Sequence, residues 1–198
     1  MAMYPKRDGV YMMTEPGSFV PGANKDVVRI VMHQTSAPQS IHDQAPINAR
    51  VWTDATRLSH VADPNSQFGI SAHFTVEWDG RIFQHVDTDD GAKGTGAYAF
   101  NAIHIEFASL NQPMTNDQLF YGADLMAWIT SVHPNVRLVT VGDSNSNPGD
   151  TRQRGITCHS FVEIVGKLDK PKTFCPGAPI IQQMNTIAVL ASVRALLP

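Results

Sequence analysis

Three residues far apart in the sequence have the types and positions of metal ligands: His33, His159 and Cys175. His33 ends the apolar run 27–32, so it is expected at the C-terminal end of a buried strand, where α/β proteins place their chemistry. His159 follows the short stretch 155–158, and Cys175 opens a Cys-Pro-Gly turn before the last predicted helix. Two imidazoles and one thiolate would leave zinc's fourth tetrahedral position open, as in a catalytic site.

The two cysteines of the chain also allow other interpretations. Cys158 and Cys175 could form a disulfide, or one of them could act as the nucleophile of a cysteine hydrolase. Neighbouring strand residues point to opposite faces, so Cys158 is expected in the core if His159 faces the site. Cys175 could still be an inert buried thiol. The Pro-Gly pair after it predicts a tight turn, which suits a metal ligand.

Local patterns predict the elements that would hold these residues. Residues 70–76 and 81–86 alternate, and Asp79-Gly80 between them predicts a two-residue hairpin turn. The other predicted elements are strands over residues 102–108 and 136–141, and helices over residues 46–60, 115–129 and 180–196, with Thr115 as an N-cap. Residues 1–26 are rich in Gly and Pro and predict an N-terminal arm on a catalytic domain at 27–198.

The strand predicted near residue 105 has two different faces. Ile103, Ile105 and Phe107 share one face, which is expected in the core. His104 and Glu106 share the other face, about 6.5 Å apart at the usual strand rise, and are expected to look into the site. Glu106 could alternatively be a solvated residue on a half-exposed strand.

Composition limits the classes of function. A chain of 198 residues with 42% hydrophobic content can form one domain with a sizeable core. The formal charge of −3 gives no basic surface for nucleic acid, and no apolar stretch approaches a membrane span. The N-terminal residues carry charges and prolines where a classical export signal needs a continuous apolar segment, so no such signal is predicted.

The order of these segments resembles the zinc-dependent N-acetylmuramoyl-L-alanine amidases of type 2 and the related peptidoglycan recognition proteins. The resemblance runs from about Val27 to about Ala195 and rests on four pieces in the family's order: IVMHQTSAP, GISAHFTVEWDGRIFQHV, FNAIHIEFAS and TFCPG. It implies an α/β fold, a single domain with a central mixed β-sheet flanked by helices. It also implies Zn²⁺ as the cofactor, held by the three ligands named above.

The resemblance further implies roles for two catalytic residues. Glu106 matches the carboxylate that takes a proton from the zinc-activated water and passes it to the leaving amine. Thr173, two residues before the third ligand, could hydrogen-bond the developing oxyanion. Many members have a tyrosine where this chain has Ala72, which excludes a phenol-assisted version of the mechanism.

The remaining histidines and one loop are interpreted less directly. His73 matches a residue that the family places beside the site without using it as a ligand, so it could support the ligands from within the sheet or contact the substrate. His104 replaces a usual glycine and shares a strand face with Glu106, so a substrate contact is predicted for it, with a spare ligand also open. The other histidines are predicted at the surface: His42, His60, His85 and His133. The polar loop 142–154 is longer than usual in the family and would add a wall to the substrate groove.

The function implied by the resemblance is hydrolysis of the amide that joins N-acetylmuramic acid to L-alanine in peptidoglycan. A monomer acting on the cell wall, in the periplasm or outside the cell, is expected. Without a classical signal, delivery would use phage lysis, carriage on a virion or specialised secretion. A non-catalytic peptidoglycan-binding module is an alternative, as is the cysteine hydrolase.

Overall fold

The computed structural model describes residues 10–12, 19–35, 72–92, 101–141, 154–165 and 174–197. Its strands are β1 (Val10–Met12), β2 (Phe19–Val20), β3 (Arg29–Gln34), β4 (Phe74–Val76), β5 (Ile82–Gln84), β6 (Gly91–Ala92), β7 (Ala102–Phe107) and β8 (Gly155–Cys158). Its helices are α3 (Asn116–Val132), α4 (His159–Val165) and α5 (Ala178–Arg194). The predicted helix at 46–60 lies outside the described residues.

The central sheet has six strands in the order β1-β5-β4-β7-β3-β8. It is mixed, because β4 and β5 pair antiparallel whereas every other neighbouring pair is parallel. Strands β2 and β6 form a separate antiparallel pair. The predicted α/β domain with a central mixed sheet and flanking helices is confirmed.

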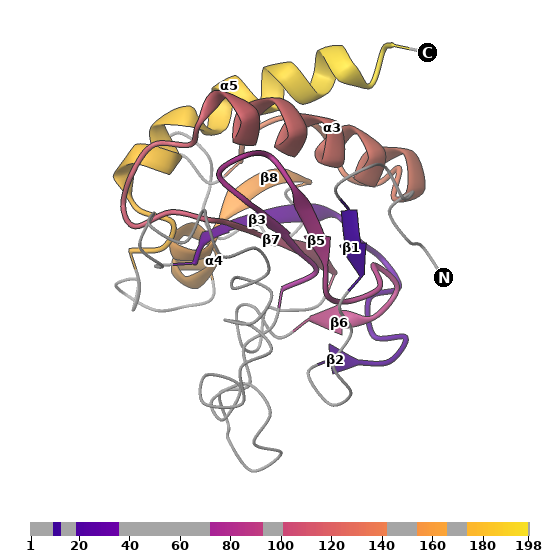
Figure 1. Ribbon diagram of the computed structural model, residues 1–198. Coiled ribbons are helices and arrows are strands. Elements are labelled where there is room, and N and C mark those ends of the chain that lie inside the picture. Colours follow the sequence, from indigo (N-terminus) through magenta and orange to yellow (C-terminus); the bar gives the residue numbers. More distant parts are fainter. Residues whose placement is uncertain are drawn as a thin grey trace.

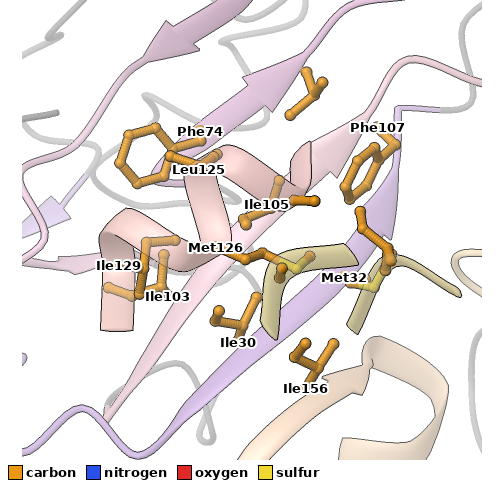
Figure 2. Packing of buried hydrophobic residues seen from close by; sticks show 14 of the residues in the cluster. Ile30, Met32, Phe74, Ile103, Ile105, Phe107, Leu125, Met126, Ile129 and Ile156 are labelled. Atoms are coloured by element: carbon orange, nitrogen blue, oxygen red, sulfur yellow. The ribbon is translucent and has the colours of Figure 1, made fainter. Parts of the chain in front are cut away.

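Helices cover the two faces of the sheet unequally. The long helices α3 and α5 lie side by side over one face, while the short helix α4 lies on the other side, near the ends of β3 and β8 (Figure 1). The main core fills the space beneath α3 and α5 (Figure 2). Its largest fully buried side chains include Ile30, Met32, Phe74, Ile103, Ile105, Phe107, Leu125, Met126, Ile129 and Ile156. The predicted core face of β7 is therefore confirmed.

Capping and apolar spacing explain the two long helices. The Thr115 hydroxyl accepts a hydrogen bond from the Gln118 backbone N–H at 3.1 Å, and the Gln118 side chain accepts one from the Thr115 N–H at 3.0 Å. This reciprocal pair satisfies two donors that a helix start leaves without partners. Helix α5 has a proline in its first turn, a position that needs no backbone donor. Both predicted helices are confirmed.

The predicted hairpin forms, but its loop has three residues rather than two. The Gly80 N–H donates to the Glu77 carbonyl at 3.0 Å, and the Glu77 N–H donates to the Arg81 carbonyl at 2.8 Å. Only Gly80 in this turn has a positive φ, 79°, whereas a two-residue type I′ turn needs two such residues. A Cβ on Gly80 would also lie 2.1 Å from the Tyr121 ring.

Two further predictions were tested by the described residues. The strand predicted at 136–141 is wrong: Thr140 alone makes a bridge, to Ile156. Val136 is buried and Leu138 packs against the core, whereas Val139 is 52% exposed, so the segment has the alternation of a strand but lacks the ladder of pairings that would make it one. Within the predicted arm, β1 is a strand of the six-stranded sheet and β2 pairs with β6.

Across the described ranges, no helix is both long and apolar enough to cross a membrane.

Candidate metal centre

Three parallel strands bring the candidate site residues to one edge of the sheet. Strand β3 lies between β7 and β8, with His33 in register with Glu106 and Met32 in register with Cys158. The C-terminal ends of the three strands therefore coincide. His159 is the first residue of α4 and not a strand residue, so the switch from strand to helix directs it away from the core that holds Cys158.

His33, His159 and Cys175 form a compact cluster. One potential ligand atom from each residue lies within 4.8 Å of the other two. The Cys175 Sγ is 3.8 Å from His33 Nδ1, and the His33 and His159 ring centroids are 4.9 Å apart. Ligands on a tetrahedral zinc are separated by about 3.4–3.6 Å, given the usual bond lengths. The donor set and its spacing thus fit a zinc ion after small side-chain adjustments.

Backbone hydrogen bonds fix the Cys175 turn against the other two ligand segments. The Gln34 N–H donates to the Cys175 Sγ at 3.4 Å, and the Ser160 N–H donates to the Cys175 carbonyl at 3.0 Å. Gly177 has a φ of 87°, and a Cβ there would approach the Asn111 side chain to 2.6 Å. Glycine is therefore required at this position, and the predicted tight turn is confirmed.

Glu106 lies next to the ligand cluster in a dry environment. Its Oε1 is 4.0 Å from His33 Nδ1, and the residue is 5% exposed. Its Oε2 is buried and has no hydrogen-bond partner among the residues that the structure describes. Burial raises the pKa of Glu106 to about 8. A buried carboxyl without donors is stabilised as a carboxylate by a nearby cation, so this group also fits a metal ion at the cluster.

The ring of His33 is held in the neutral form that metals bind. Burial, followed by the neighbouring His104 and His159, keeps the pKa of His33 well below its usual value. Its two nitrogens face different partners: Nδ1 faces Cys175 and Glu106, while Nε2 is 3.0 Å from the Nδ1 of His104. The His33 nitrogen turned toward the cluster is therefore Nδ1.

His73 and His104 lie behind the cluster and are both fully buried. Their rings stack with an interplanar angle of 7° and centroids 5.8 Å apart. The backbone N–H of His104 donates to His73 Nδ1 at 3.0 Å, so the His73 proton is on Nε2, which donates to the Asp90 carbonyl at 3.0 Å. The structure gives both rings protein partners in place of the exposed surface that a substrate contact would need. Burial lowers the pKa of His73 to about 3.

The other predicted residues have separate outcomes. Thr173 and the loop at 142–153 lie outside the described residues. Both cysteines are free, so the disulfide is excluded in this structure. Cys158 is fully buried, as predicted, and burial raises the pKa of its thiol, which disfavours a nucleophilic role.

Two buried polar groups outside the ligand cluster escaped the sequence analysis. The prediction of His85 at the surface is wrong: it is 8% exposed, and its Nε2 is 2.8 Å from the Thr75 hydroxyl, with Thr75 in register with Glu106. Alternation with Phe83 along the hairpin could have placed it on this face. The second is Asn24, whose side chain donates to the Thr88 and Ala102 carbonyls and accepts from the Ala102 N–H.

The chain is thus an α/β protein whose mixed sheet has helices on both faces and carries, at the ends of its strands, a His, His, Cys cluster with the donor types of a zinc site. The family model described as N-acetylmuramoyl-L-alanine amidase matches residues 23–178, and the chain belongs to this family. A search of curated protein sequences finds no match. The family and fold support either peptidoglycan hydrolysis at the amide or peptidoglycan recognition.

Solved structures with the same fold include both enzymes and recognition proteins. The N-acetylmuramoyl-L-alanine amidase LysC from Clostridium intestinale is 16% identical, with a TM-score of 0.53, covering 92% of this chain and 97% of its own. The Staphylococcus aureus hydrolase AmiA is 14% identical, with a TM-score of 0.60, covering 98% and 85%. Drosophila peptidoglycan recognition protein SD is 12% identical, with a TM-score of 0.59, covering 88% and 94%.

Proposed function

We propose that this protein is a zinc-dependent N-acetylmuramoyl-L-alanine amidase that cleaves the bond between N-acetylmuramic acid and the L-alanine of the stem peptide. The observation that carries the proposal is the cluster of His33, His159 and Cys175 with the buried carboxyl of Glu106 beside it. Family membership supplies the substrate class. The three ligands leave the fourth tetrahedral position for reacting groups.

A zinc ion held by these residues would polarise the scissile carbonyl and lower the pKa of a water molecule toward about 7. In this proposal Glu106, whose Oε1 is 4.0 Å from His33 Nδ1, accepts the proton of the attacking water and then donates it to the leaving amine. Its burial excludes bulk water, which would otherwise compete for that proton. Thr173 remains the proposed hydrogen-bond donor to the oxyanion.

The two alternative functions predict different chemistry at the same residues. A recognition module would bind peptidoglycan without cutting it. A cysteine hydrolase would use the Cys175 thiol with His33 as its base, since these groups are 3.8 Å apart. Two observations favour the metal site: His159 lies in the same cluster, and Glu106 Oε2 is buried without a hydrogen-bond partner among the described residues. A cysteine nucleophile needs neither feature.

Digestion of purified peptidoglycan tests the proposal. The zinc-loaded protein is expected to release new L-alanine amino termini and no new reducing sugar ends. Treatment with a chelator should abolish the release, and added zinc should restore it. Binding without new amino termini would support the recognition module instead. Activity that survives chelation but is lost in Cys175→Ala would support the cysteine hydrolase.

We also propose that the protein is a monomer acting on the cell wall as a bacteriolytic enzyme of the endolysin kind. The support is the similarity of fold to the LysC amidase and to an endolysin of a Thermus scotoductus bacteriophage, which is 15% identical with a TM-score of 0.55. Added to intact and to outer-membrane-permeabilised bacteria, the protein should lower turbidity only where it can reach peptidoglycan.

A further inference from the structure

The ring of His104 contacts the ring of His33, the first proposed metal ligand, on the side away from Cys175 and Glu106. The atoms involved are His33 Nε2 and His104 Nδ1, which are 3.0 Å apart, and both residues are buried. Two ring nitrogens at this distance form a hydrogen bond only if one carries a proton and the other does not.

The direction of this hydrogen bond follows from the proposed binding of zinc by His33 Nδ1. His33 Nδ1 faces the Cys175 Sγ at 3.8 Å and Glu106 Oε1 at 4.0 Å, so it is the nitrogen turned toward the ligand cluster. A nitrogen that binds a metal carries no proton, and a neutral imidazole then has its proton on the other nitrogen. His33 Nε2–H is therefore the donor, and His104 Nδ1 is the acceptor.

The position of the His104 ring is itself restrained. The residue lies inside β7, with its neighbours Ile103 and Ile105 fixed in the core on the opposite face. Its ring stacks on His73 at an interplanar angle of 7°, and its backbone N–H donates to His73 Nδ1. His73 is anchored in turn to the Asp90 carbonyl. The acceptor presented to His33 thus belongs to a rigid assembly.

We propose that His104 is a positioning residue, which accepts the Nε2–H hydrogen bond of His33 and thereby fixes the tautomer and ring angle that present His33 Nδ1 to the metal. The proposal rests on the zinc site proposed above. A metal-ligating histidine whose other nitrogen is held in this way binds its metal more tightly, and loss of such a partner costs roughly 10- to 100-fold in metal affinity.

A matched pair of substitutions isolates the acceptor. In His104→Asn the amide oxygen can occupy nearly the position of Nδ1, whereas His104→Leu has a similar size and shape but no acceptor. Both variants lose the stacking on His73 equally. The zinc dissociation constant of each protein is measured by competition with a chromophoric chelator. The absorption of the cobalt-substituted proteins reports ligand geometry independently of activity.

The expected result is a zinc affinity about 10- to 100-fold weaker in His104→Leu and within a few-fold of wild type in His104→Asn, with a perturbed cobalt spectrum only in the leucine variant. If His104→Leu does not fold, His104→Gln replaces it, because its longer side chain places the amide near the former Nε2. The glutamine variant should then show the same loss of affinity.

Three outcomes would overturn the proposal: wild-type affinity in the leucine or glutamine variant, an equal loss in His104→Asn, or a wild-type protein that binds no zinc. The last outcome would also remove the proposed zinc-dependent function. The expected affinity pattern in a zinc-loaded protein that leaves peptidoglycan intact would instead sustain the role of His104 and reject the amidase.

Discussion

Strands β3 and β7 send alternate side chains to two sides of the sheet, and the two sides have different chemistry. Beneath α3 and α5, Ile30, Met32 and Ile105 belong to a continuous apolar core (Figure 2). On the opposite side the same strands present His33 and Glu106, which are also buried.

Burial has a different consequence on each face. On the face beneath α3 and α5, most buried side chains are apolar and need only to fill space, and the buried amides of Gln84 and Gln118 donate to backbone carbonyls. On the site face, each buried polar atom needs a partner, and Glu106 Oε2, which has no hydrogen-bond partner among the residues that the structure describes, lies beside the proposed ligands. Residues that stabilise the fold and residues proposed for chemistry are therefore immediate neighbours along the same strand. Substitutions at neighbouring residues should therefore have unlike effects.

The largest effect is expected for Glu106→Gln. Glutamine keeps the shape of the side chain but cannot accept and return a proton, so turnover on peptidoglycan should fall on the order of 10² to 10⁴-fold. Zinc content should change little. The free energy of unfolding of the metal-free protein should rise near neutral pH, because burial raises the pKa of Glu106 to about 8 and glutamine has no charge to desolvate. The conservative Ile105→Val, one residue away on the core face, serves as the control and should keep its turnover per folded molecule. Near-wild-type turnover in Glu106→Gln would reject this carboxyl as the proton carrier.

The next effect concerns the core face alone. Ile105 is fully buried, in register with Phe74 of β4, so Ile105→Ala leaves a cavity beneath the helices. The free energy of unfolding should fall by about 2–5 kcal/mol, measured by chemical denaturation. Zinc affinity of the folded protein should remain within a few-fold of wild type. Loss of zinc from fully folded Ile105→Ala would show that the two faces are coupled rather than separate.

Local sequence patterns were sufficient for the features that depend on one segment. Alternation separated Ile105 from Glu106, and the ends of apolar runs located His33 and His159. Contacts between strands distant in the sequence were not predictable in this way. The His33–His104 hydrogen bond depends on the lateral register of β3 and β7, which no local pattern encodes.

The errors have physical causes of the same kind. His85 looked like a surface residue because Gln84 and Asp87 near it are polar, yet pairing of β4 with β5 buries it against Thr75. Residues 136–141 have strand-forming types, but they lie beyond β8 at the sheet edge and make one bridge there. Sequence alone could assign side chains to the two faces of each strand. The pairing of strands in the tertiary structure decided which of those faces are buried.

The smallest expected effect is a pH dependence of the free energy of unfolding that comes from the site face. The described residues of the apolar core beneath α3 and α5 carry no titratable side chain except the Cys158 thiol, so they contribute little to it. Burial lowers the pKa of His85 to about 4, against an ordinary value of 6.5. Between these values the unfolded chain binds a proton that the folded protein does not. The contribution of His85 to the free energy of unfolding is therefore fully present above about pH 6.5 and is lost as the pH drops toward 4.

His85→Gln tests this expectation, since the glutamine amide can take the place of Nε2 beside Thr75 without titrating. Wild type should lose about 2–3 kcal/mol more than the variant between about pH 7.5 and pH 4.5. Urea denaturation with a chelator present in both proteins makes the measurement, so that acid-driven metal release affects neither curve. The difference at about pH 7.5, where His85 is neutral in both states, provides the baseline. Parallel stability curves for the two proteins would mean that His85 is solvated in solution, and that the site face is more open than the structure has it.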